Sequence, residues 1–194
     1  PSGGGIIKGG GGGPHHNKWF VSLGAGTGGG YVSGKTEQAR ENVKCCFAPA
    51  LLHVLPEFGY QMSPSSTLSL AVRIGFPVGA DLPGHATAAP AALLRYRKTL
   101  KPTGEGLAWS AALGGGLLRN TVPLSVMGTD TAVSGPLLVG GGLGYLKGKG
   151  STKLVAELNT IAGIPIVSDM GGDPPVVPHF GLEFDLNLAL VFGF

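Results

Sequence analysis

Ionisable and amide side chains recur at alternate positions in several segments of this sequence. The set comprises His53, Glu57, Arg73, Arg95, Arg97, Glu157, Glu183, Asp185 and Asn187. Carboxylates, guanidinium groups and an imidazole could form ion pairs, transfer protons or, with a nearby serine, assist hydrolysis. A spacing of two residues puts side chains on the same face of an extended strand. The chemistry of the set therefore depends on what that face contacts.

The last sixteen residues, His179–Phe194, show which side chains lie on the face opposite the polar one. Their apolar positions are Phe180, Leu182, Phe184, Leu186, Leu188, Leu190, Phe192 and Phe194, all on one side of a strand. At about 3.3 Å per residue such a strand spans more than a lipid hydrocarbon core. The pattern predicts the closing strand of a membrane β-barrel, with its acidic face toward a polar lumen.

Similar alternation predicts seven further strands, so that the expected fold is all-β, an eight-stranded antiparallel up-and-down transmembrane barrel over residues 17–194. The further strands are expected at 17–27, 49–62, 67–76, 91–99, 107–117, 137–146 and 153–164, with long loops at 28–48, 77–90, 118–136 and 165–178. Long and short connections alternate, as in outer-membrane barrels. Interfacial aromatic residues are expected on the short-turn side: Trp19, Tyr60, Tyr96, Trp109, Tyr145 and Phe194. A soluble lipocalin-like barrel would reverse the two faces of every strand.

Composition agrees with a barrel and excludes several other classes. Only 13% of residues are charged, and no apolar run reaches the length of a transmembrane helix. The 36 glycines and 15 prolines disfavour long helices. The net charge of +3 comes from scattered bases, so no nucleic-acid partner is predicted.

The beginning of the chain and its cysteines receive no functional role. Residues 1–16 are expected to be a glycine-rich flexible tether or a cloning remnant. No signal peptide is present, which predicts a mature or trimmed chain. Cys45 and Cys46 are adjacent, so a disulfide between them would be strained, and we interpret them as an incidental pair in a loop.

The alternating segment that ends on Phe194 resembles the C-terminal signature of bacterial outer-membrane β-barrel proteins. Over residues 17–194 the chain resembles small eight-stranded barrels of the OmpA and OmpW types. The stretch GPLLVGGGLGYLKGKGSTKLVAELN is similar to the penultimate hairpin of barrel domains in myxobacterial and related envelope proteins. These resemblances imply a bacterial outer-membrane location and the lipid bilayer as a partner.

Inside a narrow eight-stranded barrel, the polar set is expected to form a salt-bridged plug. The hairpin between the second and third predicted strands would put Glu57 almost opposite Arg73. Two alternatives remain: a lumen that passes water or a ligand, and a lipid-modifying enzyme that uses His53, a serine and Glu57. The enzyme is disfavoured because His53 is expected to point inward.

Two glycine-rich matches suggest nucleotide binding as a rival. Gly24–Gly29 fits G-x-G-x-x-G, which chance explains in a chain with 36 glycines. Gly29–Thr36 fits the less frequent G-x-x-x-x-G-K-[ST] of P-loop proteins and includes Lys35. A P-loop protein needs a parallel sheet covered by helices, and the sequence contains no second amphipathic helix.

The predicted function is a structural anchor or docking platform for an envelope assembly, with no catalysis, cofactor or metal. A protein partner is expected at the loops or at the N-terminal tether. The alternatives are a small pore or ligand-binding barrel and, more remotely, a P-loop nucleotide-binding protein.

Overall fold

The computed structural model describes residues 18–79, 88–149, 151–171 and 175–193, without the side chains of 45–51 and 149. Eight strands form one closed antiparallel barrel, which confirms the predicted fold class. They are β1 (Trp19–Lys35), β2 (Asn42–Ser63), β3 (Ser66–Phe76), β4 (Ala89–Thr99), β5 (Gly106–Gly116), β8 (Leu137–Lys149), β9 (Thr152–Ile164) and β10 (Gly181–Phe192). The tether predicted at 1–16 and the terminal Phe194 lie outside the described residues.

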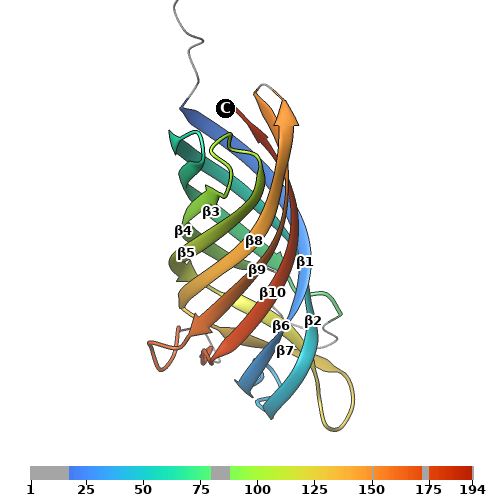
Figure 1. The fold of residues 1–194 in the computed structure, drawn as a ribbon. Coiled ribbons are helices and arrows are strands. Elements are labelled where there is room, and N and C mark those ends of the chain that lie inside the picture. Colours follow the sequence, from blue (N-terminus) through green and yellow to red (C-terminus); the bar gives the residue numbers. More distant parts are fainter. Residues whose placement is uncertain (1–17, 80–87, 150, 172–174, 194) are drawn as a thin grey trace, which may run out of the picture.

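The strands follow one another around the barrel, and β1 pairs with both β2 and β10, which closes the sheet. The connections β2–β3, β4–β5 and β8–β9 lie at the end of the barrel where the chain terminates (Figure 1). The other four connections lie at the opposite end. We call these the short-turn end and the long-loop end.

Burial alternates along the strands, because successive side chains point to opposite faces of a sheet. In β9, for example, Val155, Glu157 and Asn159 are buried, whereas Leu154 and Leu158 are about half exposed, at 51% and 56%. The outward face is therefore apolar and the inward face carries the charges. This is the reverse of a soluble barrel with an apolar interior.

Strands β1 and β2 extend well beyond the predicted boundaries. The segment 28–48 was expected to be a loop, but β1 continues to Lys35 and β2 begins at Asn42. These extensions lack the continuous apolar outward face of the rest of the barrel, so their polar composition resembles that of a loop. Cys45 consequently lies in β2, paired with Val32 of β1, and not in a loop.

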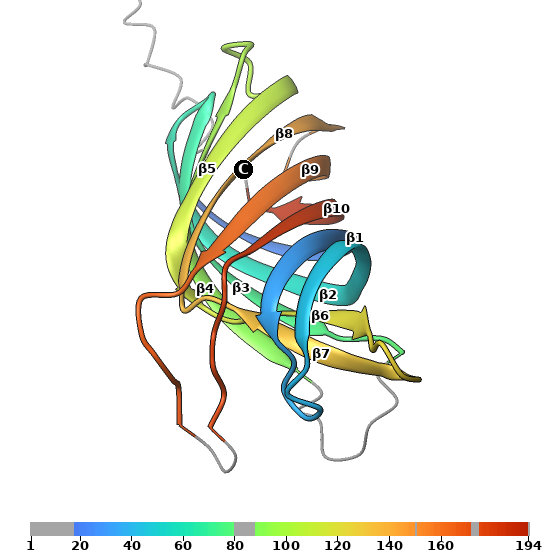
Figure 2. The same cartoon turned by 90° about the horizontal axis from the view of Figure 1, so that it is seen from below.

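A two-stranded hairpin, β6 (Leu118–Pro123) and β7 (Thr129–Ser134), occupies the segment 118–136 that was predicted to be a long loop. Figure 2 shows this hairpin at the long-loop end, beside the extensions of β1 and β2. Leu118 packs into the apolar cluster inside the barrel, and Val122 packs with Val32 and Val43. The hairpin thus caps the long-loop end from within.

The P-loop alternative, which the sequence already disfavoured, does not match the structure. Gly29–Lys35 belongs to β1, where Gly29 pairs with Phe184 of β10 and Lys35 with Asn42 of β2. A P-loop instead connects a strand to a helix and leaves its backbone amides free for phosphate. Every ladder between the named strands is antiparallel. In the described part of the chain, no helix is long and apolar enough to cross a bilayer.

Candidate functional site

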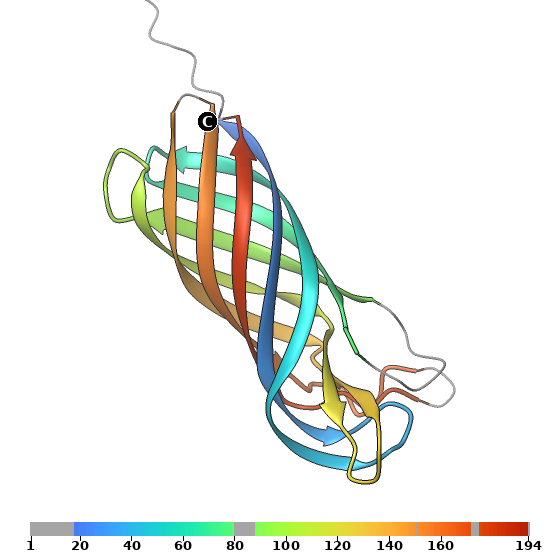
Figure 3. The ribbon, with the colours of Figure 1, turned by 90° about the vertical axis from the view of Figure 1, so that its right-hand side faces the viewer.

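The nine polar residues singled out from the sequence all lie inside the barrel. Each is buried, with an exposed fraction of 4% or less. They come from five strands: His53 and Glu57 from β2, Arg73 from β3, Arg95 and Arg97 from β4, Glu157 from β9, and Glu183, Asp185 and Asn187 from β10. The strands tilt across the barrel, so residues distant in sequence meet in its interior (Figure 3).

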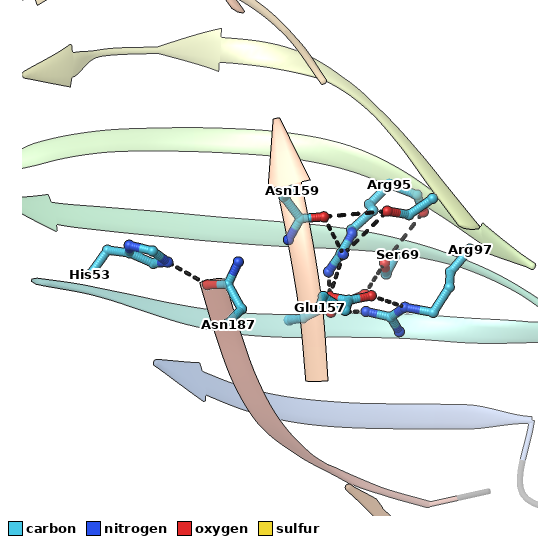
Figure 4. Close-up of polar contacts among 9 residues, drawn as sticks. His53, Ser69, Arg95, Arg97, Glu157, Asn159 and Asn187 are labelled. Carbon is cyan, nitrogen blue, oxygen red and sulfur yellow. Dashed lines mark hydrogen bonds and ion pairs between the residues drawn. The ribbon is translucent and has the colours of Figure 1, made fainter. Parts of the chain in front are cut away.

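The first cluster joins two arginines of β4 to two glutamates. Glu157 Oε2 lies 2.5 Å from Arg95 Nη2, and Glu157 Oε1 lies 2.8 Å from Arg97 Nε. Glu57 Oε2 lies 3.3 Å from Arg97 Nη2 and 3.5 Å from Arg95 Nη1. The Ser69 hydroxyl donates a hydrogen bond to Glu57. Figure 4 shows Arg95, Arg97 and Glu157 of this cluster, with Ser69 beside them. These bonds pair the two positive charges on β4 with two negative charges across the lumen.

The second cluster lies nearer the long-loop end and centres on Arg73. Its Nη2 lies 2.6 Å from Glu183 Oε1, and its Nε lies 3.1 Å from Asp185 Oδ2. His53 Nε2 forms a hydrogen bond with Asn187 Oδ1, and His53 Nδ1 lies 3.9 Å from Asp185 Oδ1. Gly26 makes room for this pair, because a Cβ there would overlap the Asn187 side chain and approach His53 Nε2 to 2.7 Å.

The predicted proximity of Glu57 to Arg73 does not lead to an ion pair between them. The β2–β3 register places Glu57 opposite Ala71, and the same ladder pairs His53 with Gly75. Arg73 therefore reaches β10, and Glu57 meets the arginines of β4. A hairpin register predicted from sequence cannot foresee these contacts, since closure of the barrel brings a third strand within reach.

Between the two clusters lies a cavity of about 30 Å³ lined by Arg73, Arg95, Asn159 and Asp185, among others. A water molecule needs roughly 10–15 Å³ on the same scale, so the cavity holds about two waters. Ion pairs and apolar side chains fill the barrel on both sides of it. The geometry favours cross-barrel pairing over ion passage.

The residues of the hydrolase alternative are not arranged for catalysis. His53 belongs to the second cluster, whereas Glu57 and its serine partner Ser69 belong to the first. In the described residues, no hydrogen bond joins His53 to a serine. A nucleophile and its base must lie within hydrogen-bonding reach. Nor do three His, Cys, Asp or Glu side chains gather as a metal site within those residues.

A third polar cluster, missed in the sequence, fixes the β6–β7 hairpin to the β1–β2 connection. Arg119 Nε lies 3.0 Å from Glu37 Oε2, which also accepts a 2.6 Å hydrogen bond from Thr131 Oγ1. Asp130 Oδ2 accepts hydrogen bonds of 3.0 and 2.8 Å from the amides of Gln38 and Ala39. The available signal was the run Thr129–Ser134, which is rich in β-branched residues and typical of a strand.

His179, in the connection between β9 and β10, bridges β1 and β7. Its Nε2 accepts a 2.8 Å hydrogen bond from the Lys35 amide, and its own amide donates to Val133 O at 2.8 Å. A side chain at Gly34, which has a φ of 140°, would collide with the imidazole ring. Partial burial, and secondarily the charge of Lys35, lower the pKa of His179.

Acid is therefore expected to loosen this bridge. Because the folded-state pKa lies below the ordinary value near 6.5, the contribution of His179 to stability is complete above that pH and falls as the pH drops through the folded-state pKa. Protonation removes the acceptor of the Lys35 amide, a bond worth about 1 kcal/mol. Hydrogen exchange should show protection of that amide decreasing in acid relative to pH 7.5, by about fivefold once His179 is protonated, after correction for intrinsic rates. A His179→Phe variant should lack this pH difference; an unchanged difference would contradict the assignment.

The aromatic residues predicted for the interface lie near the short-turn end. The Trp19 and Tyr60 rings are 4.9 Å apart, and the Tyr96 and Trp109 rings are 5.4 Å apart. Tyr145 is 52% exposed on the outward face, and Phe194 lies outside the described residues. Such amphipathic rings suit the boundary between hydrocarbon and headgroups.

The chain matches no protein-family model and no curated relative. Its structure is similar to the barrel of Neisserial surface protein A, with a TM-score of 0.48 and 13% identity, covering 91% of this chain and 97% of that one. It is also similar to the N-terminal β-barrel domain of Pseudomonas aeruginosa OprF, with a TM-score of 0.44 and 14% identity over 89% and 97% of the two chains. A third similar structure is the attachment invasion locus protein Ail of Yersinia pestis, with a TM-score of 0.45 and 10% identity, covering 90% of this chain and 99% of that one.

Proposed function

We propose that this protein is an outer-membrane β-barrel that serves as a structural anchor or docking platform for an envelope assembly. The supporting observation is the division between its two faces. Outward leucines such as Leu158 and Leu186 are each exposed by 56%, while the acidic residues Glu157, Glu183 and Asp185 of the same strands are buried. A surface of this kind is costly in water and suited to hydrocarbon.

The asymmetry of the connections supports an orientation. Outer-membrane barrels have short periplasmic turns and longer external loops. By this rule the short-turn end faces the periplasm, and the β6–β7 hairpin faces the exterior. The similarity of residues 135–159 to barrel domains of myxobacterial envelope proteins supports a role within such an envelope.

The hairpin tip supports the docking role. Val126 and Met127, between β6 and β7, are exposed by 89% and 86%, although the hairpin itself is fixed to the barrel by the Arg119–Glu37 ion pair. A rigid base that presents exposed apolar side chains is suited to contact a protein partner. The proposed platform uses no cofactor and performs no catalysis.

Planar-bilayer recording tests the plugged lumen against the alternative of a small pore. Because two ion-pair clusters cross the interior, the reconstituted barrel is expected to show no steady conductance above that of the bare membrane. Heat-modifiable gel migration of the same sample serves as the folding control. Reproducible channels from protein that passes this control would contradict the plug and favour a pore.

A further inference from the structure

Positive charge is concentrated at one end of the described barrel. At the short-turn end, outside the two lumen clusters, the described basic side chains are Lys18, Lys98, Lys101, Lys147 and Lys153. Glu105 is the single acidic side chain described there. At the long-loop end, Lys35, Arg40, Lys44 and Arg119 are matched by Glu37, Glu41, Asp130 and Asp169. Among the described side chains, the excess of bases therefore lies at the short-turn end.

Two of these lysines belong to the outward face, beside aromatic rings. Lys98 of β4 pairs directly with Trp109 of β5, so the two side chains share a face. Lys147 of β8 lies two positions beyond Tyr145 on the same outward side, and both are exposed. Figure 3 shows the short-turn ends of β4, β5 and β8 on adjacent parts of the wall. We call Lys98, Trp109 and Lys147 the basic face.

The lysines of the basic face have no ion-pair partner among the described side chains. Within the described residues, neither Lys98 nor Lys147 forms an ion pair with a carboxylate. Their neighbour Leu107 is 59% exposed on the same wall. Lysines whose stems lie along apolar surface while their ammonium groups reach the interface are suited to lipid phosphates. A soluble acidic protein would approach from the end of the barrel, not from its apolar wall.

We propose that the basic face selectively binds anionic glycerophospholipids of the adjoining leaflet. The ammonium groups of Lys98 and Lys147 contact the phosphates, and Trp109 lies at the glycerol level between them. This inference rests on the proposed function, because it requires the barrel to lie in a membrane. In the proposed orientation, the leaflet that adjoins the basic face is the one that faces the periplasm.

Trp109 provides the reporter for a direct test. A Trp19→Phe variant leaves Trp109 as the single tryptophan. This variant is reconstituted in phosphatidylcholine vesicles that contain either brominated phosphatidylglycerol or brominated phosphatidylcholine at equal fractions. Bromine quenches tryptophan only at short range, so the ratio of quenching measures local enrichment. We expect phosphatidylglycerol to be enriched roughly two- to fivefold, and less so at high salt.

Matched charge removals assign the enrichment to the basic face. Lys98→Gln combined with Lys147→Gln should bring the ratio close to one. Lys35→Gln combined with Lys44→Gln, which removes equal charge at the long-loop end, should leave it unchanged. Equal quenching by the two lipids in the parent protein would overturn the proposal. So would an equal loss of enrichment in both double variants, because that would reflect overall charge.

Heat-modifiable migration of each sample separates this inference from the proposed function. A folded, inserted barrel without lipid preference would overturn only the proposal that the basic face binds anionic lipids. Failure of the parent chain to insert overturns both.

Discussion

Glu157→Met is expected to lower the free energy of unfolding of the barrel by about 3 kcal/mol, the scale of a broken buried ion pair. Glu157 accepts bonds of 2.5 Å from Arg95 and 2.8 Å from Arg97, and all three side chains are buried. Without it, both guanidinium groups share Glu57 alone. One positive charge then remains uncompensated in an interior with space for about two waters.

A double-mutant cycle distinguishes ion pairing from packing. Arg97→Met alone should cost about as much as Glu157→Met, since it leaves an excess carboxylate. Together the two substitutions remove one charge of each sign and leave the Arg95–Glu57 contact at 3.5 Å. We expect the double variant to lie within about 1 kcal/mol of the parent, because apolar replacements of a buried pair are often nearly neutral.

Urea titration of the barrel folded in lipid vesicles measures all four proteins. The matched control is Glu105→Met, which removes an exposed carboxylate in the β4–β5 turn and should change stability by less than about 0.5 kcal/mol. Additive effects of the two lumen substitutions would show that the cluster fills space without coupling its charges.

Which side chains point inward and which point outward could be predicted from sequence, because each face of a strand has a single chemical environment. Leu154, Glu157 and Leu158 differ in burial as their alternation requires, since one face forms the apolar outer wall and the other faces the polar lumen. The eight barrel strands and the inward position of the polar set follow from this pattern. Two different environments leave a periodic signal even in a chain with 36 glycines.

The long-loop end could not be predicted by the same reasoning. There, one face of β1 and β2 contacts the β6–β7 hairpin and the opposite face includes polar side chains, so Gly30–Lys35 shows no continuous apolar face. In β6, the consecutive residues Leu118–Val122 are all buried, which removes the alternation altogether. Both segments resemble loops by composition, although backbone pairing makes them strands.

The choice of partners inside the lumen was also beyond the sequence. Arg73 meets Glu183 on β10, three strands away around the barrel, and Glu157 meets Arg97 on β4. These contacts depend on strand tilt and on the stagger with which the sheet closes. The spacing of residues within one strand contains no information about either the tilt or the stagger.

Leu186→Arg should have the second large effect, because it tests which solvent covers the outer wall. Leu186 lies near the middle of β10, opposite Leu158 of β9 and Thr27 of β1, and is 56% exposed. An arginine near the bilayer midplane of a barrel costs about 2–4 kcal/mol. We expect a loss of this size when unfolding by urea is measured in vesicles.

Val126→Arg is the matched control, since Val126 is also apolar and exposed but lies at the tip of the β6–β7 hairpin. It should change stability by less than about 0.5 kcal/mol, as expected for a side chain in water. Both variants place an arginine at an exposed apolar position, one on the barrel wall and one at the hairpin tip, so a large difference between them reports the environment of the wall. Equal, small effects would mean that water covers the leucine face, and the membrane assignment would then fail together with the proposed orientation of the barrel.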